Sequence, residues 1–294
     1  MSEGEVKPFA SLKAESYRAL CNRAALYLEE YGIDDAGIDA ALLMEYVYGV
    51  DRRSFLLRGE EEADPDKFDE YSCLLYKRAR RIPLQHLTGV QNFMGLDFEV
   101  SEDVLIPRQD TEILVEEVLK DNISSASVLD LCTGSGCILI SLMHYASSVR
   151  GTGVDLSEAA LRMAEKNASA LCPECEDRLI WICADLYEGV DGKYDYIVSN
   201  PPYIASDVIS DLMEEVRDHD PLMALDGGKD GLDFYRRIIE GAARHLNPEG
   251  KIYLEIGFDQ GESVAALLEK AGFTDICVVK DYNGLDRVVK ASCV

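Results

Sequence analysis

From about residue 110 to its end, the chain alternates short apolar runs with longer segments of helical periodicity. Such alternation favours a mostly parallel sheet that is covered by helices on both faces. The strands are expected at 128–131, 151–154, 180–183, 194–198 and 252–256. Helices are expected at 110–119 with Asp110 as the cap, at 137–145, and after the capping residue Ser157.

The last two apolar runs, 276–279 and 287–289, flank the dipeptide Asn283-Gly284. Asn-Gly between two apolar runs is a strong signal for a tight hairpin, because both residues tolerate a positive φ. We therefore expect an α/β fold whose sheet is mostly parallel and contains one antiparallel strand near the end of the chain.

Three amphipathic segments precede the alternating region. Helices are expected at 15–31, at 35–48, and from the start signal Asp64-Pro65 to about residue 80. In the second helix, the apolar residues at helical spacing that should face a core are Ile38, Leu42, Leu43, Tyr46 and Val47. Pro83 ends the helical domain. The expected divisions are a helical domain at 1–83, a connector at 84–108 with a hairpin of two short strands at 86–89 and 95–100, and the α/β domain at 109–294.

The formal net charge of −26 limits the partners that the chain can bind. An acidic surface repels phosphate backbones, so direct DNA binding is not expected and a basic protein segment is the favoured partner. One exception is the cationic run Lys77, Arg78, Arg80 and Arg81, which is either a solvated helix end or a docking patch. No apolar run reaches the length of a membrane span, and the polar start lacks the apolar core of a secretory signal. We expect a cytoplasmic monomer.

The nine cysteines favour free thiols, because their number is odd and their spacing is irregular. Cys172 and Cys175 form a C-x-x-C pair, and Cys183 lies nearby. A structural zinc site needs four ligands, and neither a second cysteine pair nor a close histidine is present in the sequence. We therefore expect reduced thiols and no metal.

Three polar signals follow successive expected strands and indicate a ligand site. Gly134-Ser135-Gly136 separates a strand from a helix, which lets the backbone approach a ligand closely. Leu139 stands where a dinucleotide fingerprint would have its third glycine, which disfavours a dehydrogenase. Asp155 ends the next strand and is suited to accept ribose hydroxyls. Asp185 and Leu186 end the one after it, where a carboxylate can accept from an exocyclic amine and an apolar side chain can cover a purine. The three strand ends predict an adenosine-containing ligand.

The most specific segment is Asn200-Pro201-Pro202-Tyr203, which we call the proline strip. Proline cannot donate to a strand ladder, and each proline restricts the residue before it, so the strip is stiff. An amide nitrogen is a poor nucleophile that a protein can activate by orientation. The side-chain oxygen of Asn200 and the carbonyl of Pro201 can accept from an NH2 group and aim its lone pair at a methyl donor. Tyr203 can stack on the planar amide, and no general base is needed before transfer.

The sequence resembles the release-factor glutamine N5-methyltransferases over nearly its whole length. The segments that carry the resemblance are 83–89 (Pro-Leu-Gln-His-Leu-Thr-Gly), 106–112 (Ile-Pro-Arg-Gln-Asp-Thr-Glu), 130–136 (Asp-Leu-Cys-Thr-Gly-Ser-Gly), 199–204 (Ser-Asn-Pro-Pro-Tyr-Ile) and the glycine-rich region 220–232. Three positions depart from the family pattern. Cys132 replaces the usual glycine, Gln109 a frequent proline, and His86 a frequent tyrosine.

The resemblance implies a class I methyltransferase domain with a seven-stranded sheet, S-adenosylmethionine as the cofactor and S-adenosylhomocysteine as its product. The implied partners are peptide chain release factors, which would be methylated on the glutamine of a Gly-Gly-Gln motif, with the helical domain recognising the substrate. Residues 200–203 would hold that glutamine, while Phe93 either lines its pocket or packs in the core. The expected cofactor contacts are Cys132, Thr133, Gly134, Ser135, Gly136, Asp155, Asp185, Leu186 and Asn200.

Three other functions fit part of the pattern. Enzymes that methylate a glutamine of a ribosomal protein share the strip, but the segment around Pro107-Arg108 and the N-terminal helices favour release factors. Adenine-N6 methyltransferases use a similar strip, and the net charge disfavours them. A non-catalytic adaptor that binds a release factor would need neither the strip nor the glycine loop.

Overall fold

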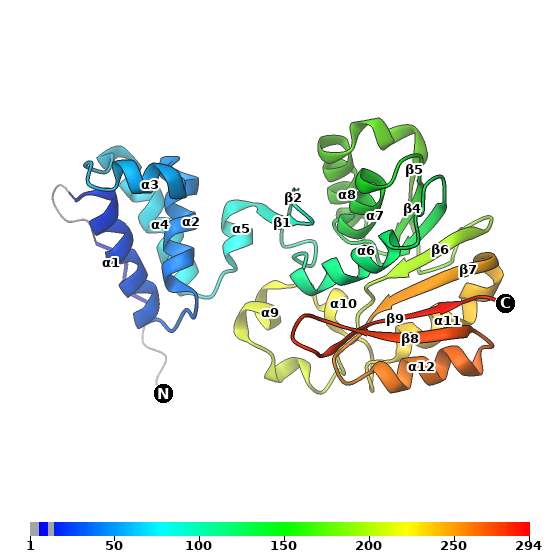
Figure 1. The fold of residues 1–294 in the computed structure, drawn as a ribbon. Coiled ribbons are helices and arrows are strands. Elements are labelled where there is room, and N and C mark those ends of the chain that lie inside the picture. Colours follow the sequence, from blue (N-terminus) through cyan, green and yellow to red (C-terminus); the bar gives the residue numbers. More distant parts are fainter. Residues whose placement is uncertain (1–5, 11–14) are drawn as a thin grey trace. The chain divides into compact units, whose positions relative to one another are not determined.

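The alternating region forms one seven-stranded sheet, as the sequence predicts (Figure 1). Its strands are β3 (Ser127–Leu131), β4 (Arg150–Asp155), β5 (Leu179–Cys183), β6 (Tyr194–Ser199), β7 (Leu246–Glu255), β8 (Thr274–Lys280) and β9 (Asp286–Ser292). The strand order is β5-β4-β3-β6-β7-β9-β8. Strand β9 runs antiparallel to both of its neighbours and is joined to β8 across Asn283-Gly284, so the expected hairpin and single antiparallel strand are confirmed.

Helices cover both faces of this sheet (Figure 1). One face packs against α6 (Glu112–Leu119), α7 (Cys137–Tyr145) and α8 (Glu158–Leu171), and the other packs against α11 (Asp233–His245) and α12 (Gly261–Lys270). The expected caps differ in outcome. Ser157 caps α8 by accepting from the Ala160 amide. Asp110 does not cap α6, because it lies inside the 3-10 turn η2 (Gln109–Thr111) and pairs with Arg287 at 3.1 Å.

The chain reverses direction across the sheet at β3. From β3 it proceeds outward to β4 and β5, and it then returns to place β6 on the opposite side of β3. In open α/β sheets, such a switch point leaves a crevice at the carboxyl ends of the strands. The segments between strands also include η3 (Pro173–Arg178), η4 (Ile209–Asp211), α9 (Glu214–His219) and α10 (Leu222–Leu225).

The structure describes residues 6–10 and 15–294, and the chain divides into two compact units, Met1–Gly89 and Val90–Val294. The expected hairpin begins the second unit, with β1 (Val90–Phe93) paired to β2 (Leu96–Glu99). Its first strand was expected at 86–89, which is wrong. Those residues belong to the helix α5 (Leu84–Thr88), which Gly89 ends in a left-handed conformation by donating to the Gln85 carbonyl. Phe93 is fully buried and packs edge-on against Phe98, so its core alternative is confirmed.

Besides α5, the described part of the helical unit contains the three expected helices and a short one that the sequence did not predict. They are α1 (Tyr17–Glu30), α2 (Ala36–Tyr48), α4 (Phe68–Ala79) after the 3-10 turn η1 (Pro65–Lys67), and the additional α3 (Arg52–Arg58). The predicted core face of α2 is partly wrong. Leu43 and Val47 are buried, whereas Ile38, Leu42 and Tyr46 are exposed. Helix α2 is apolar on most of its circumference, so periodicity alone could not identify the side that packs.

The cationic run at the end of α4 does not act as one surface. Arg78 is buried and pairs with the buried Asp39 at 2.6 Å, while Lys77 and Arg80 are exposed. Both sequence alternatives are therefore wrong for Arg78, because its guanidinium serves the interior of the helical unit. A buried arginine requires such a partner, since an unpaired charge in the interior is costly.

The C-x-x-C pair is not reduced in this fold. Cys172 and Cys175 form a disulfide across the turn after α8, so the expectation of reduced thiols is wrong for this pair, whose Cα atoms lie 5.3 Å apart. Cys183 is free and exposed.

Among the described residues, every helix is too short or too polar to cross a membrane.

Candidate functional site

A cavity of about 600 Å³ opens at the carboxyl ends of β3, β4 and β6, within the Val90–Val294 unit. Its volume is that of a pocket for a cofactor-sized ligand. The predicted site residues that line it are Cys132, Thr133, Gly134, Ser135, Asp155, Asp185, Leu186, Asn200 and Pro202. Gly136, Pro201 and Tyr203 lie beside these residues in the chain but do not line the cavity. The three strand ends and the strip therefore meet at one place.

The glycine loop follows β3 and turns sharply into α7. Gly134 has a φ of +55° and Gly136 a φ of +79°, a left-handed region that side chains rarely adopt. A Cβ atom on Gly136 would also lie 2.8 Å from the Cδ1 atom of Ile140 and 3.1 Å from the Cβ atom of Ala164, so a side chain there would force these neighbours to shift. Cys132 adopts a φ of +58° without being glycine, which is uncommon, and burial raises the pKa of its thiol.

Two backbone amides fix the Asp155 carboxylate at the cavity wall. One oxygen accepts from the Gly134 N–H and the other from the Ser157 N–H, both at 2.9 Å. Burial raises the pKa of this carboxyl, although the two amide bonds act in the opposite direction. Each carboxylate oxygen has two lone pairs, so both can still accept a ligand hydroxyl.

The third strand end is more crowded than the sequence suggests. Asp185 pairs with Arg237 of α11 at 2.7 Å, and Arg237 itself lines the cavity. This pairing could not be predicted from the sequence, because the two residues lie on elements that are distant along the chain. Leu186 is 6% exposed and offers an apolar surface to the same cavity.

The proline strip begins where β6 ends. The Asn200 side chain lines the cavity and donates from Nδ2 to the Oγ1 atom of Thr111 at 3.3 Å. The Tyr203 ring packs against the core below the sheet, and burial raises the pKa of its hydroxyl.

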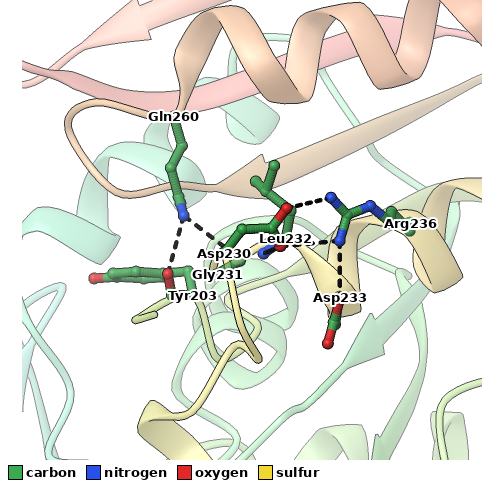
Figure 2. Close-up of polar contacts among 7 residues, drawn as sticks. All are labelled: Tyr203, Asp230, Gly231, Leu232, Asp233, Arg236 and Gln260. Atoms are coloured by element: carbon green, nitrogen blue, oxygen red, sulfur yellow. Dashed lines mark hydrogen bonds and ion pairs between the residues drawn. The ribbon is translucent and has the colours of Figure 1, made fainter. Parts of the chain in front are cut away.

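The side chain of Gln260 is hydrogen-bonded to the backbone of the strip at Tyr203 (Figure 2). The Nε2 atom of Gln260 donates to the Tyr203 carbonyl at 2.9 Å and to the Gly231 carbonyl at 3.2 Å, while its Oε1 accepts from the Gly257 amide at 2.9 Å. The loop that contains Gly231 packs directly on the strip, since a Cβ atom on Gly231 would lie 2.3 Å from the backbone carbonyl oxygen of Tyr203. The glycine-rich segment and Gln260 thus fix where the strip lies.

Several charged and polar residues near the strip were missed as functional candidates. Arg108 lines the cavity and forms an ion pair with the buried Asp220. Thr111 lines it too and faces the buried Glu255, whose pKa burial raises to about 7 although hydrogen bonding to Thr111 acts to lower it. Arg108, Thr111 and Asp220 lie in segments that carry the family resemblance, which could have identified them. Glu255 had no such signal beyond its place at the end of a strand.

Comparisons with known proteins agree with this geometry. The PrmC N-terminal domain family matches residues 19–89, and the methyltransferase small domain family matches residues 108–219. The release factor glutamine methyltransferase of Geobacter sulfurreducens is 40% identical over 264 residues, which are 90% of this chain and 92% of that protein. The protein of the same name from Clostridium acetobutylicum is 42% identical and covers 86% of this chain and 90% of its own length.

A solved structure, that of a methyltransferase from Pyrococcus furiosus, is similar in fold. Its sequence identity is 20%, its TM-score is 0.50, and the likeness covers 68% of this chain and 89% of that one. At this identity the likeness concerns the fold alone.

Proposed function

Because this chain belongs to the family of release factor glutamine methyltransferases, we propose that it transfers a methyl group from S-adenosylmethionine to the side-chain amide nitrogen N5 of a glutamine. The substrate is the glutamine of the Gly-Gly-Gln motif in peptide chain release factors, which the chain meets as a monomer in the cytoplasm. The observation that carries the proposal is that Asn200 lines the same cavity as the glycine loop and Asp155.

The cavity fits the cofactor by the chemistry of its walls. Asp155 presents a fixed carboxylate suited to two ribose hydroxyls, and Leu186 presents an apolar side chain suited to a purine face. Asp185 is suited to the exocyclic amine of the base, and Arg237 steadies that carboxylate. The glycine loop 132–136 admits the rest of the ligand close to the backbone. When bound, S-adenosylmethionine supplies a methyl group on a positively charged sulfur.

The strip then prepares the target nitrogen. The Oδ1 atom of Asn200 accepts from the NH2 group of the glutamine and holds its lone pair toward the methyl group. The carbonyl of Pro201 is the predicted second acceptor, although Pro201 lies beside the cavity lining rather than in it. As the nitrogen gains positive charge, both acceptors hold it more strongly, which lowers the barrier selectively. The product nitrogen is acidic and releases its proton to water. Stacking of the Tyr203 ring on the target amide stays a prediction, since that ring packs on the core beside the cavity.

The test is mass spectrometry of a release factor that has been incubated with the purified chain and S-adenosylmethionine. We expect a gain of one methyl group on the glutamine of Gly-Gly-Gln, and none on a matched release factor in which asparagine replaces that glutamine. Transfer instead to a ribosomal protein or to adenine in DNA, offered in parallel reactions, would overturn the proposal. So would binding of the release factor without any transfer, which an adaptor would show.

A further inference from the structure

A buried glutamate, Glu255, lies beside the first residue of the proline strip. Ser199 of β6 pairs with Leu254 of β7, so Asn200 and Glu255 follow next to each other at the ends of two hydrogen-bonded strands. Glu255 is 1% exposed, and its Oε2 atom is buried without a hydrogen-bond partner in the described part of the chain. The reaction as proposed above gives this carboxyl no task, although a buried carboxyl is costly to keep.

Thr111 connects this glutamate to the strip. Its hydroxyl accepts from the Asn200 Nδ2 atom at 3.3 Å, and the same residue faces the Glu255 carboxyl closely enough to lower the pKa of that carboxyl by hydrogen bonding. Thr111 is 2% exposed, so bulk water does not compete for these bonds on the side away from the cavity. The three side chains therefore form one continuous series that ends at the wall of the cavity.

The direction of each bond follows from the chemistry of the three groups. A carboxamide has a donor end and an acceptor end, and a hydroxyl can bond to either one. An ionised carboxylate only accepts, so it requires the Thr111 hydroxyl to donate to it. That hydroxyl is then left with lone pairs for Asn200, and only the NH2 end of the carboxamide can face it. The Oδ1 end must consequently face the cavity.

We infer that Glu255, acting through Thr111, is a positioning residue that fixes the Asn200 carboxamide with its oxygen toward the target amide; the inference rests on the proposed function of that site. Neither Glu255 nor Thr111 touches the reacting atoms in this account. Their part is to exclude the flipped carboxamide, which would present NH2 to NH2 and could not orient the substrate.

The surroundings of Glu255 determine when it is ionised. Burial has the largest effect and raises its pKa to about 7, and the negative charge of Asp110 acts in the same direction. The Thr111 hydrogen bond and the positive charges of Arg287 and Arg108 lower it. From α11, the Tyr235 hydroxyl donates to the Glu255 backbone carbonyl at 2.8 Å, which leaves the side chain unaffected.

The ionised form thus dominates above neutral pH and is lost as the pH falls through about 7. A protonated Glu255 can donate to Thr111, whose hydroxyl is then free to donate to the Oδ1 end of a flipped Asn200. The turnover number kcat should therefore step down as the pH falls through about 7, to a plateau about two- to tenfold lower, because the protonated carboxyl no longer fixes the carboxamide but still permits the productive orientation.

The first test compares pH profiles of kcat for the full chain and for Glu255→Gln at saturating substrates. Glutamine can either accept from Thr111 or donate to it, at any pH. We expect kcat of the variant to be about two- to tenfold lower than that of the parent at pH 8.5, as for the loss of part of one hydrogen bond. We also expect its kcat to show no step near pH 7. The matched control is Glu269→Gln on the exposed side of α12, which should keep the step. A step that persists in Glu255→Gln would overturn the inference.

The second test changes the middle member of the series. Thr111→Val removes the hydroxyl at nearly constant shape and should lower kcat about tenfold, as loss of one hydrogen bond would. Thr111→Ser keeps the hydroxyl and should restore kcat to within about twofold of the parent. Equal kcat values for the valine and serine variants would contradict the positioning role.

A direct readout separates this inference from the proposed function. In the isolated protein, the 13C resonance of the Glu255 carboxyl should titrate near neutral pH, and the 15N resonance of the Asn200 side-chain amide should shift with it. No transfer to a release factor at any pH would refute the proposed function and leave this titration unaffected. Transfer by the parent together with an Asn200 resonance that ignores the Glu255 titration would refute only the inference.

Discussion

Gln260 offers a test of how the strip is held, because one substitution replaces a single hydrogen-bond donor with an acceptor. Gln260→Glu keeps the size of the side chain and the oxygen that accepts from the Gly257 amide. It replaces the Nε2 donor, which serves the Tyr203 and Gly231 carbonyls, with an acceptor. Two bonds of about 0.5–1.5 kcal/mol each are lost, and two carbonyls then face a carboxylate.

We expect the Val90–Val294 unit to lose about 2–4 kcal/mol of unfolding free energy at pH 8, once the loss of both bonds is combined with the cost of an unsatisfied buried carbonyl. The strip should also shift, and a displacement near 1 Å can cost about a hundredfold in rate. Urea unfolding gives the stability, and saturated methyl transfer at pH 8 gives the rate. The matched control is Gln91→Glu in the hairpin, where the Nε2 atom bonds only to the neighbouring Asn92 carbonyl in the described structure. Equal unfolding free energies and equal kcat values for the two variants would refute the reasoning.

Two further changes test other parts of the account. Asp155→Ala should weaken cofactor binding in calorimetry by about tenfold or more, since a charged group contributes about 1.5–3 kcal/mol per hydrogen bond. The kcat at saturating cofactor should change less. An unchanged cofactor affinity would show that Asp155 does not bind the ribose hydroxyls. Asp39→Ala should destabilise the helical unit by about 3–5 kcal/mol in urea unfolding, because it leaves the buried Arg78 charge without this carboxylate; a loss below about 1 kcal/mol would show that Arg78 reaches water.

The sequence predicted the features that depend on local pattern. Periodicity identified the strands of the sheet and the helices α6, α7 and α8, although not α9 to α12, and Asn283-Gly284 predicted the hairpin that makes β9 antiparallel. The successive strand ends predicted that the glycine loop, Asp155 and Asn200 would meet, and all three line one cavity. These inferences succeed because the ends of neighbouring parallel strands lie on the same edge of a sheet.

The features that the sequence did not predict depend on tertiary packing. Helix α2 has apolar residues on two sides, and only its contacts with α1 and α4 decide that Leu43 is buried and Ile38 is not. The pairing of Asp185 with Arg237 and the series from Asn200 to Glu255 both join elements that are remote in the sequence. Residue types alone do not indicate which polar groups the fold will bring together.

The central claim is that the Asn200 carboxamide orients the target nitrogen, and single-turnover methyl transfer by Asn200→Ala at saturating cofactor tests it most directly. The account predicts a rate lower by roughly 10²–10³, as for the loss of one preorganised polar group at a reacting centre, with the protein still folded. A rate within a few fold of the parent would contradict the claim.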